Sequence, residues 1–147
     1  ATRKVILPLL AAGHHLVTRA RTLPNMRVHP PTRDMKAVYR KARILAAPSL
    51  METWGRTVTE AQFSGIPAIA RDVGALREAV AGGGVMMPSD ADAKAWAIEL
   101  RRLWNDDVLY ADFSRRALGA ANRPEIAPDR SVDRLLDVLR AEIARRR

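Results

Sequence analysis

The chain has 147 residues, of which 48% are hydrophobic and 28% are charged, and this balance predicts a soluble globular protein with one compact domain over residues 1–147. It excludes an intrinsically disordered chain, and the longest apolar run, residues 5–12, is too short to span a bilayer. Cysteine is absent, which excludes disulfides and a thiol nucleophile and is typical of a reducing compartment. We therefore expect a cytoplasmic location.

The positive charge is concentrated near the amino terminus. The formal net charge is +9, and residues 1–45 carry ten Lys or Arg against a single acid, Asp34. Such a field attracts anions, so one candidate partner is the anionic inner face of a membrane, which the chain would contact peripherally. Nucleic acid is a weaker candidate, because the only aromatic residue there is Tyr39, which we expect in the core. The alternative is a bias toward Arg without functional meaning.

The first third of the chain is predicted to alternate helix and strand. After a break at Gly13, the pattern favours a short helix over 14–22 and a short strand over 26–29, which two prolines end. Thr32 is then expected to cap a helix of about residues 33–42.

The middle of the chain repeats a strand and helix unit. Residues 43–47 are continuously apolar, which predicts a strand buried on both faces. A strand, a helix and a strand within so few residues imply a right-handed parallel crossover. In chain order we expect a loop over 48–55, a helix over 56–64, a strand over 67–70, a helix over 75–81, a glycine turn over 82–84 and a strand over 85–87.

The last part of the chain is predicted to be helical, with a helix over 109–120 between two others. Each outer helix carries an apolar stripe that we expect in the core: Trp96, Leu100, Leu103 and Trp104 on one, and Val132, Leu135, Leu136, Leu139 and Ile143 on the other. These patterns predict a doubly wound, open parallel α/β domain, with its core over 1–104 and C-terminal helices over 105–147. Its ligand belongs at the carboxyl ends of the strands.

The residues suited to chemistry gather in residues 48–67, between a buried strand and a helix. Gly55 allows a ligand to approach the backbone, and the free amides of residues 55–58 suit a phosphate. Glu52 lies in the loop before these amides, and Glu60 lies one turn inside the helix. Two carboxylates therefore flank a site for an anion.

Around these carboxylates the sequence reads Pro48-Ser49, Glu52-Thr53-Trp54-Gly55, Glu60-Ala61 and Gly65-Ile66-Pro67. This frame resembles the donor-site signature of the group 1 retaining glycosyltransferases, called family 4, whose GT-B fold has two facing Rossmann-like domains. The likeness covers roughly residues 22–104. It implies the donor-binding half of an enzyme that moves a hexosyl group from a nucleoside-diphosphate sugar to an acceptor hydroxyl, with retention and with neither a metal nor another cofactor.

The resemblance assigns roles to both carboxylates. Glu52, the catalytic candidate, would face the donor sugar and its developing oxocarbenium charge. Glu60 would accept hydrogen bonds from the two neighbouring ribose hydroxyls, which two carboxylate oxygens match well.

The other implied contacts lie on either side of these acids. Beside Trp54, the amides near Gly55, Arg56 and Thr57 would hold the diphosphate as negative charge grows on the leaving group. The base would be bound by the backbone at His29 and Pro30.

Arg56 departs from the family pattern, which usually reads Gly-Phe-Gly-Leu where this chain has Thr53-Trp54-Gly55-Arg56. One interpretation is that its guanidinium pairs with the donor phosphates. The alternative is a surface ion pair with Glu60, four residues later on the same helix.

The resemblance also suggests that the chain alone is inactive. The family's first donor-domain strand and helix are not found here, nor is its amino-terminal acceptor-binding domain, so we expect that domain as a partner. The rival hypothesis is a noncatalytic module whose basic third binds nucleic acid or a membrane surface.

Asp90 and Asp92 resemble a metal motif, but they are better explained as acids at a helix start that Ser89 caps.

Overall fold

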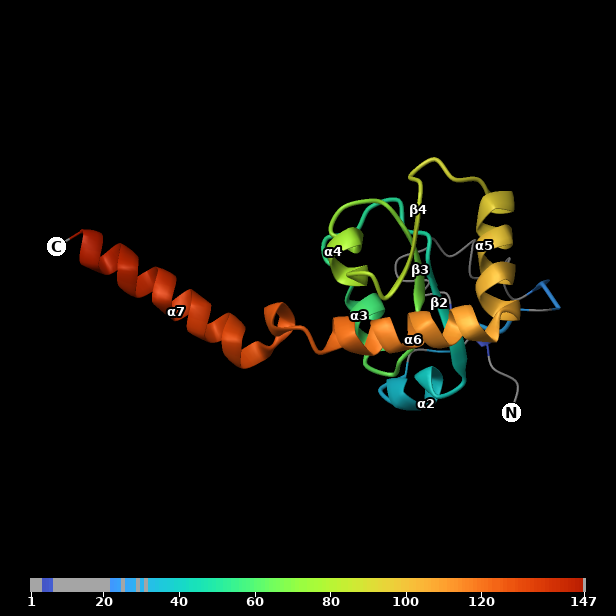
Figure 1. Ribbon diagram of the computed structural model, residues 1–147, viewed down its shortest axis with the longest axis horizontal. Helices are drawn as coiled ribbons and strands as arrows, with labels where there is room; N and C mark the ends of the chain where they lie inside the picture. Colours follow the sequence, from blue (N-terminus) through green and yellow to red (C-terminus); the bar gives the residue numbers. More distant parts are fainter. Residues whose placement is uncertain (1–3, 7–21, 25, 29, 31, 147) are drawn as a thin grey trace.

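The computed structural model describes residues 4–6, 22–24, 26–28, 30 and 32–146. Its centre is a four-stranded parallel sheet in the order β1-β2-β3-β4 (Figure 1). The strands are β1 (Lys4–Ile6), β2 (Ala42–Ala47), β3 (Ala68–Arg71) and β4 (Gly84–Met87). Helices cover both of its faces, which confirms the predicted open, doubly wound α/β fold.

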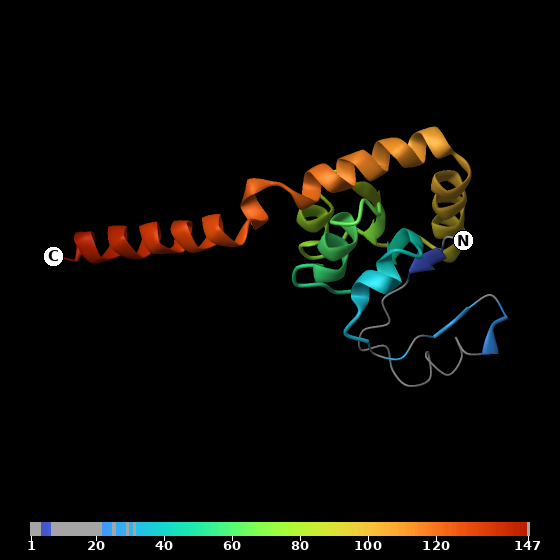
Figure 2. The same ribbon diagram turned by 90° about the horizontal axis from the view of Figure 1, so that it is seen from below.

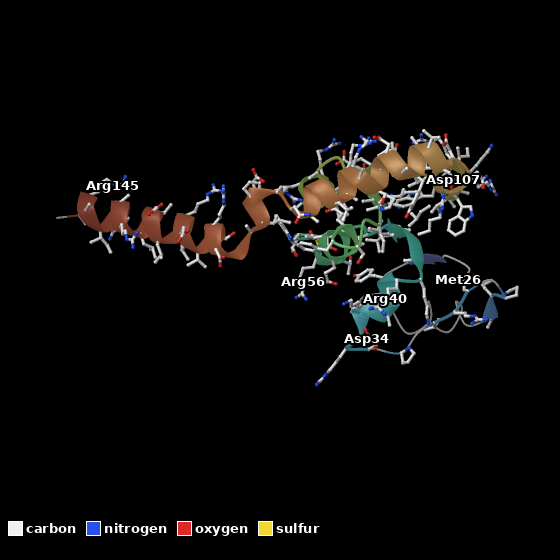
Figure 3. All side chains as sticks on the ribbon, turned by 60° about the horizontal axis from the view of Figure 1, so that its bottom comes forward. Met26, Asp34, Arg40, Arg56, Asp107 and Arg145 are labelled. Carbon is white, nitrogen blue, oxygen red and sulfur yellow. The ribbon has the colours of Figure 1, made fainter. Side chains whose placement is uncertain are left out.

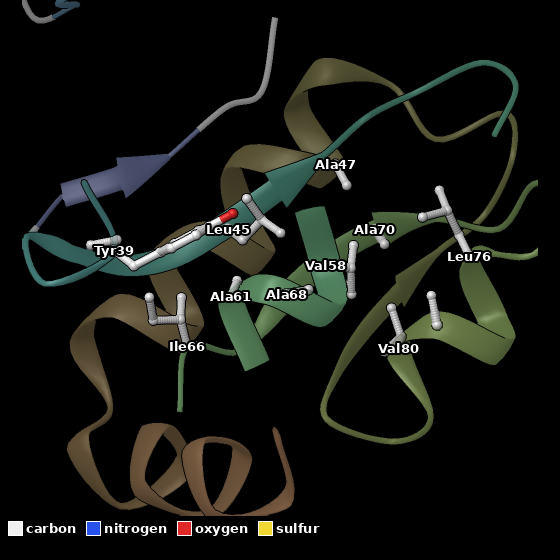
Figure 4. Close-up of a cluster of buried hydrophobic side chains, with 12 residues drawn as sticks. Tyr39, Leu45, Ala47, Val58, Ala61, Ile66, Ala68, Ala70, Leu76 and Val80 are labelled. Atoms are coloured by element: carbon white, nitrogen blue, oxygen red, sulfur yellow. The ribbon is translucent and has the colours of Figure 1, made fainter. Parts of the chain in front are cut away.

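Alternate residues of the buried strands point to opposite faces of the sheet, so each strand contributes to two cores. On one face, residues such as Leu45 and Ala70 pack against α3 (Arg56–Gln62) and α4 (Leu76–Val80), as Figure 4 shows. On the other face, residues such as Ile44 and Ile69 pack against α5 (Ala93–Asn105) and α6 (Asp107–Ala121). The continuous apolar run of β2 follows from this double burial.

The elements of the middle of the chain begin and end within two residues of their predicted bounds. The glycine turn is shorter than predicted, because Gly84 already pairs with Ala68 as the first residue of β4. The α6 helix also contacts the segment that follows α3, where the Ser114 hydroxyl donates to the Gly65 carbonyl at 2.7 Å.

Two predicted helix caps are wrong. The helix α2 (Met35–Tyr39) is shorter than predicted and is capped by Asp34, whose carboxylate accepts from the Ala37 amide at 3.0 Å. Asp92 likewise replaces Ser89 at α5 and accepts from the Ala95 amide at 2.8 Å. In both cases the acid lies three residues before a first-turn amide that has no partner within the helix, which is the spacing that a cap requires.

The predicted strand over 26–29 is also wrong for its described residues, because 26–28 form no strand. The Met26 amide donates to the Leu23 carbonyl at 3.1 Å, so this stretch is part of a turn rather than of a ladder. His29 and the predicted helix residues 14–21 lie outside the described residues.

The last helix does not join the core, contrary to the prediction. After a short 3-10 helix, η1 (Pro124–Ile126), α7 (Pro128–Arg145) extends away from the sheet in both views (Figures 1 and 2). The stripe predicted to be buried is instead 40% to 58% exposed: Val132, Leu135, Leu136, Leu139 and Ile143. A helical period reports an apolar face, but it does not report that a partner lies within reach. Among the described residues no helix is both long and apolar enough to cross a membrane.

The contrast between α5 and α7 predicts unequal effects of the same truncation. Leu103 of α5 is fully buried, so Leu103→Ala should lower the free energy of unfolding by about 2–5 kcal/mol. Leu135 of α7 is 58% exposed, so Leu135→Ala should change it by no more than about 0.5 kcal/mol. Urea denaturation of the two variants measures both values, and an equal loss would contradict the exposed position of α7.

Candidate functional site

The loops that follow β2, β3 and β4 are tied together at the carboxyl edge of the sheet. Arg71, the last residue of β3, donates from Nε to the Pro48 carbonyl at 3.3 Å and from Nη1 to the Ser89 carbonyl. Its guanidinium also lies 5.9 Å from the centre of the Trp96 ring. This side chain therefore joins the loop after β2 to the loop after β4.

Two glycines allow the loop over 48–55 to lie directly on its neighbours. Gly74 has a φ of +52°, and a Cβ there would come within 1.9 Å of the Glu52 carbonyl oxygen. Gly55 has a φ of +84°, and a Cβ there would lie 2.7 Å from Leu76 Cδ2 at the start of α4. Side chains at these positions would be both strained and obstructed. The close packing of this loop on its neighbours, which we call its seat, therefore requires glycine at both positions.

The carboxylate of Glu52 turns back toward its own loop. Its Oε1 accepts from the Thr53 amide at 3.1 Å and, over a longer contact of 3.5 Å, from the Trp54 amide. Both Glu52 and Trp54 are half-buried. The negative charge of Glu52 is thus met by backbone amides beside the start of α3.

The carboxylate of Glu60 is held from two sides. Oε2 accepts from the Tyr39 hydroxyl at 3.0 Å, and Oε1 lies 3.4 Å from Nη2 of Arg56. The Glu60 side chain is 37% exposed, whereas the Arg56 side chain is 86% exposed. One oxygen is therefore tied to the core, and the other faces an exposed partner.

Burial raises the pKa of Tyr39 above its ordinary value, and the hydrogen bond to Glu60 and the charge of that carboxylate raise the pKa further. The phenol consequently remains protonated and keeps donating at neutral pH. The sequence interpretation placed Tyr39 only in the core and missed this contact. The signal that could have revealed it is chemical, since a buried tyrosine hydroxyl usually finds an acceptor.

The start of α3 offers unpaired donors. The amides of Val58 and Thr59 donate to the Gly55 carbonyl at 2.9 and 3.3 Å, but within the described part of the chain no acceptor is recorded for the amides of Arg56 and Thr57. Arg56 lies on the same side of the molecule as Arg40, and Asp107 lies on the other (Figure 3). The observed Arg56–Glu60 contact is the ion pair that the sequence offered as the alternative to phosphate binding.

The structure places most of the predicted site residues in one stretch of the chain. Glu52, Trp54, Gly55, Arg56 and Thr57 follow one another from the loop into α3, with Glu60 in contact with Arg56. Of the base-binding candidates, His29 lies outside the described residues and Pro30 is exposed. Their role stays a prediction.

Of the two acids before α5 that resemble a metal motif, one has a structural role. Asp92 is engaged as the cap of α5. Nowhere in the described ranges do three or more metal-ligating side chains form a cluster.

Comparison with known proteins gives one family. The family described as "Glycosyl transferases group 1" matches residues 4–106. The D-inositol 3-phosphate glycosyltransferase of Salinispora tropica is 38% identical over 141 residues, which are 94% of this chain and 28% of that protein. The chain thus spans less than a third of the length of this relative.

Solved structures share the fold, and two of them illustrate it. The sucrose-phosphate synthase of Thermosynechococcus elongatus superposes with a TM-score of 0.69 at 22% identity. The superposed part is 90% of this chain and 34% of the synthase chain. Anabaena HepE, solved in complex with UDP, superposes with a TM-score of 0.65 at 18% identity over 82% of this chain and 36% of its own. The described core therefore has the fold of these two proteins.

The glycine seat of the loop can be tested by adding one methyl group. Gly74→Ala should force the Glu52 backbone away and lower the free energy of unfolding by about 1–3 kcal/mol, since alanine must also adopt a left-handed conformation. Urea denaturation gives the energy, and NMR shifts of the Thr53 and Trp54 amides report the loop.

Gly119→Ala is the matched control. Gly119 lies in α6, where a Cβ would meet nothing within 4 Å, so this change should be neutral or stabilising by up to about 1 kcal/mol. Unchanged Thr53 and Trp54 shifts in Gly74→Ala would contradict the proposed seat.

Proposed function

Because the chain belongs to the group 1 glycosyl transferases, we propose that it is the donor-binding half of a retaining transferase that moves a hexosyl group from a nucleoside-diphosphate sugar to an acceptor hydroxyl. The observation that carries this proposal is the Glu60 carboxylate, held at one oxygen by Tyr39 and paired at the other with the exposed Arg56, one turn from the free amides of α3. A ribose and the adjoining phosphate of one nucleotide need those two kinds of group side by side.

In this proposal the two oxygens of Glu60 accept hydrogen bonds from the ribose hydroxyls. The amides of Arg56 and Thr57, together with the Arg56 guanidinium, meet the diphosphate charge that grows as the bond to the anomeric carbon breaks. These groups supply the positive charge, so the scheme includes no metal ion. The UDP of Anabaena HepE agrees with this class of donor.

Glu52 has the complementary role in the proposal. Its carboxylate lies in the loop that leads into α3, where it would face the sugar and stabilise the positive charge of an oxocarbenium-like transition state. The long 3.5 Å contact to the Trp54 amide leaves the carboxylate room to turn toward a donor.

The acceptor would be bound elsewhere in the full enzyme. This chain corresponds to 28% of the Salinispora relative, so most of that relative's length has no counterpart here. We propose an acceptor-binding domain as the partner and expect the isolated chain to bind nucleotide without transferring sugar.

Calorimetric titration of the chain with UDP, GDP and a short DNA duplex tests the proposal. We expect one nucleotide to bind with a submillimolar Kd and Glu60→Ala to abolish this binding, because the ribose loses both acceptors. Glu99→Ala is the control, since Glu99 is likewise a partly buried helix acid paired with an arginine, Arg102 on α5. Nucleotide binding that survives Glu60→Ala would contradict the proposal, and salt-sensitive duplex binding would favour the noncatalytic alternative.

Arg56→Ala tests the phosphate contact separately. With a side chain that is 86% exposed, its removal should leave the melting temperature within about 2 °C of the parent and weaken nucleoside-diphosphate binding more than nucleoside binding. Arg115→Ala on α6 is the control, because Arg115 is a similarly exposed arginine in a surface ion pair. Equal affinities for the parent and Arg56→Ala would leave the guanidinium with no part in phosphate binding.

A further inference from the structure

We propose that Tyr39 is a positioning residue that orients the Glu60 carboxylate and thereby makes the site prefer ribonucleotides over 2′-deoxyribonucleotides. This inference rests on the proposed function, because it assigns the ribose to Glu60. Tyr39 itself does not touch the nucleotide in this scheme. It acts through the carboxylate that does.

The Tyr39 ring is fixed before any ligand arrives. Tyr39 is the last residue of α2, is only 7% exposed, and packs among the buried residues of the face covered by α3, near Ala61 and Ile66 (Figure 4). Its hydroxyl reaches Glu60 from a different helix, 21 residues earlier in the sequence. The direction of the hydrogen bond is therefore set by the core and not by the flexible Glu60 side chain.

The two oxygens of Glu60 are held unequally. Oε2 receives the buried Tyr39 donor at 3.0 Å and keeps a second lone pair for a ligand. Oε1 has only the longer, exposed contact to Arg56 at 3.4 Å, which is an ion pair that a ligand displaces at little cost. Tyr39 thus holds Oε2 in place and restrains the orientation of the carboxylate, while Arg56 can leave Oε1.

This asymmetry bears on sugar selection. Neighbouring 2′ and 3′ hydroxyls must meet two acceptors at once, so the carboxylate plane has to match the plane of the two hydroxyls. A carboxylate that is free to rotate must first be ordered, and the entropy lost in ordering it offsets part of the hydrogen-bond energy. A 2′-deoxyribose offers one hydroxyl and satisfies one oxygen in any orientation, so it gains much less from a fixed plane.

The plain alternative is that the contact merely ties α2 to α3. That role would appear in stability and would change the affinities for ribose and 2′-deoxyribose nucleotides equally. The ratio of the ribonucleotide affinity to the 2′-deoxyribonucleotide affinity distinguishes a positioning role from a purely structural one, because only a positioning role changes this ratio.

The experiment compares the parent chain with Tyr39→Phe, which keeps the buried ring and removes the hydroxyl. Using whichever of UDP or GDP the parent binds, together with its 2′-deoxy analogue, we expect Tyr39→Phe to weaken ribonucleotide binding roughly three- to tenfold and to leave the 2′-deoxy affinity nearly unchanged. Tyr110→Phe is the matched control, since Tyr110 packs with the cluster on the other face of the sheet. An unchanged ratio in Tyr39→Phe would overturn the inference.

The Glu60→Ala variant separates the failure of this inference from the failure of the proposed function. If Glu60→Ala retains the ribose preference, the proposed ribose contact itself is wrong. If Glu60→Ala no longer binds the nucleotide and a folded Tyr39→Phe keeps the ribose preference of the parent, only the role of Tyr39 is wrong.

A second measurement leaves Tyr39 in place, in case Tyr39→Phe does not fold. The chain has two tyrosines, so 3-fluorotyrosine incorporated into Tyr110→Phe labels Tyr39 alone. We expect the ribonucleotide to shift the ¹⁹F resonance, because a ribose hydroxyl joins Tyr39 on Oε2, and the 2′-deoxy analogue to shift it less. Equal shifts at saturation would overturn the inference.

Discussion

The contact between the Glu52 backbone and Gly74 is the constraint on which the rest of the site depends. A Cβ at position 74 would overlap the Glu52 carbonyl, so the loops after β2 and β3 can meet only because that atom is missing. Gly55 allows the same kind of close packing at the start of α3, where it lies against Leu76 of α4. The catalytic candidate and the free amides are thus placed by backbone packing, which does not depend on the rotamers of exposed side chains.

The carboxylates at this edge have different surroundings, and the difference suits different tasks. Glu52 accepts hydrogen bonds only from amides of its own loop, one of them over a long 3.5 Å contact. Glu60 is bound to a buried phenol from another helix, so its orientation is fixed. A group that selects a rigid sugar benefits from being held in one orientation.

Much of the fold follows from the sequence, because strands buried on both faces and helices with one apolar face leave strong patterns. The loop over 48–55 is predicted on the same grounds, because it lies between a buried strand and a helix. Three kinds of detail were missed. The caps depend on which acid lies three residues before a free amide, the exposed position of α7 depends on where the chain leaves η1, and the Tyr39–Glu60 bond joins residues far apart in sequence.

An amide-resolved NMR titration of the chain with the nucleoside diphosphate that it binds tests the central claim most directly. The account predicts that the largest shifts fall on the amides of Arg56, Thr57 and Glu60, together with those of the Glu52 loop. The shallow pocket between β4 and α5, lined by Met86, Ile98 and Arg102 among others, offers a clear contrast. Saturable shifts that gather there and spare α3 would contradict the account.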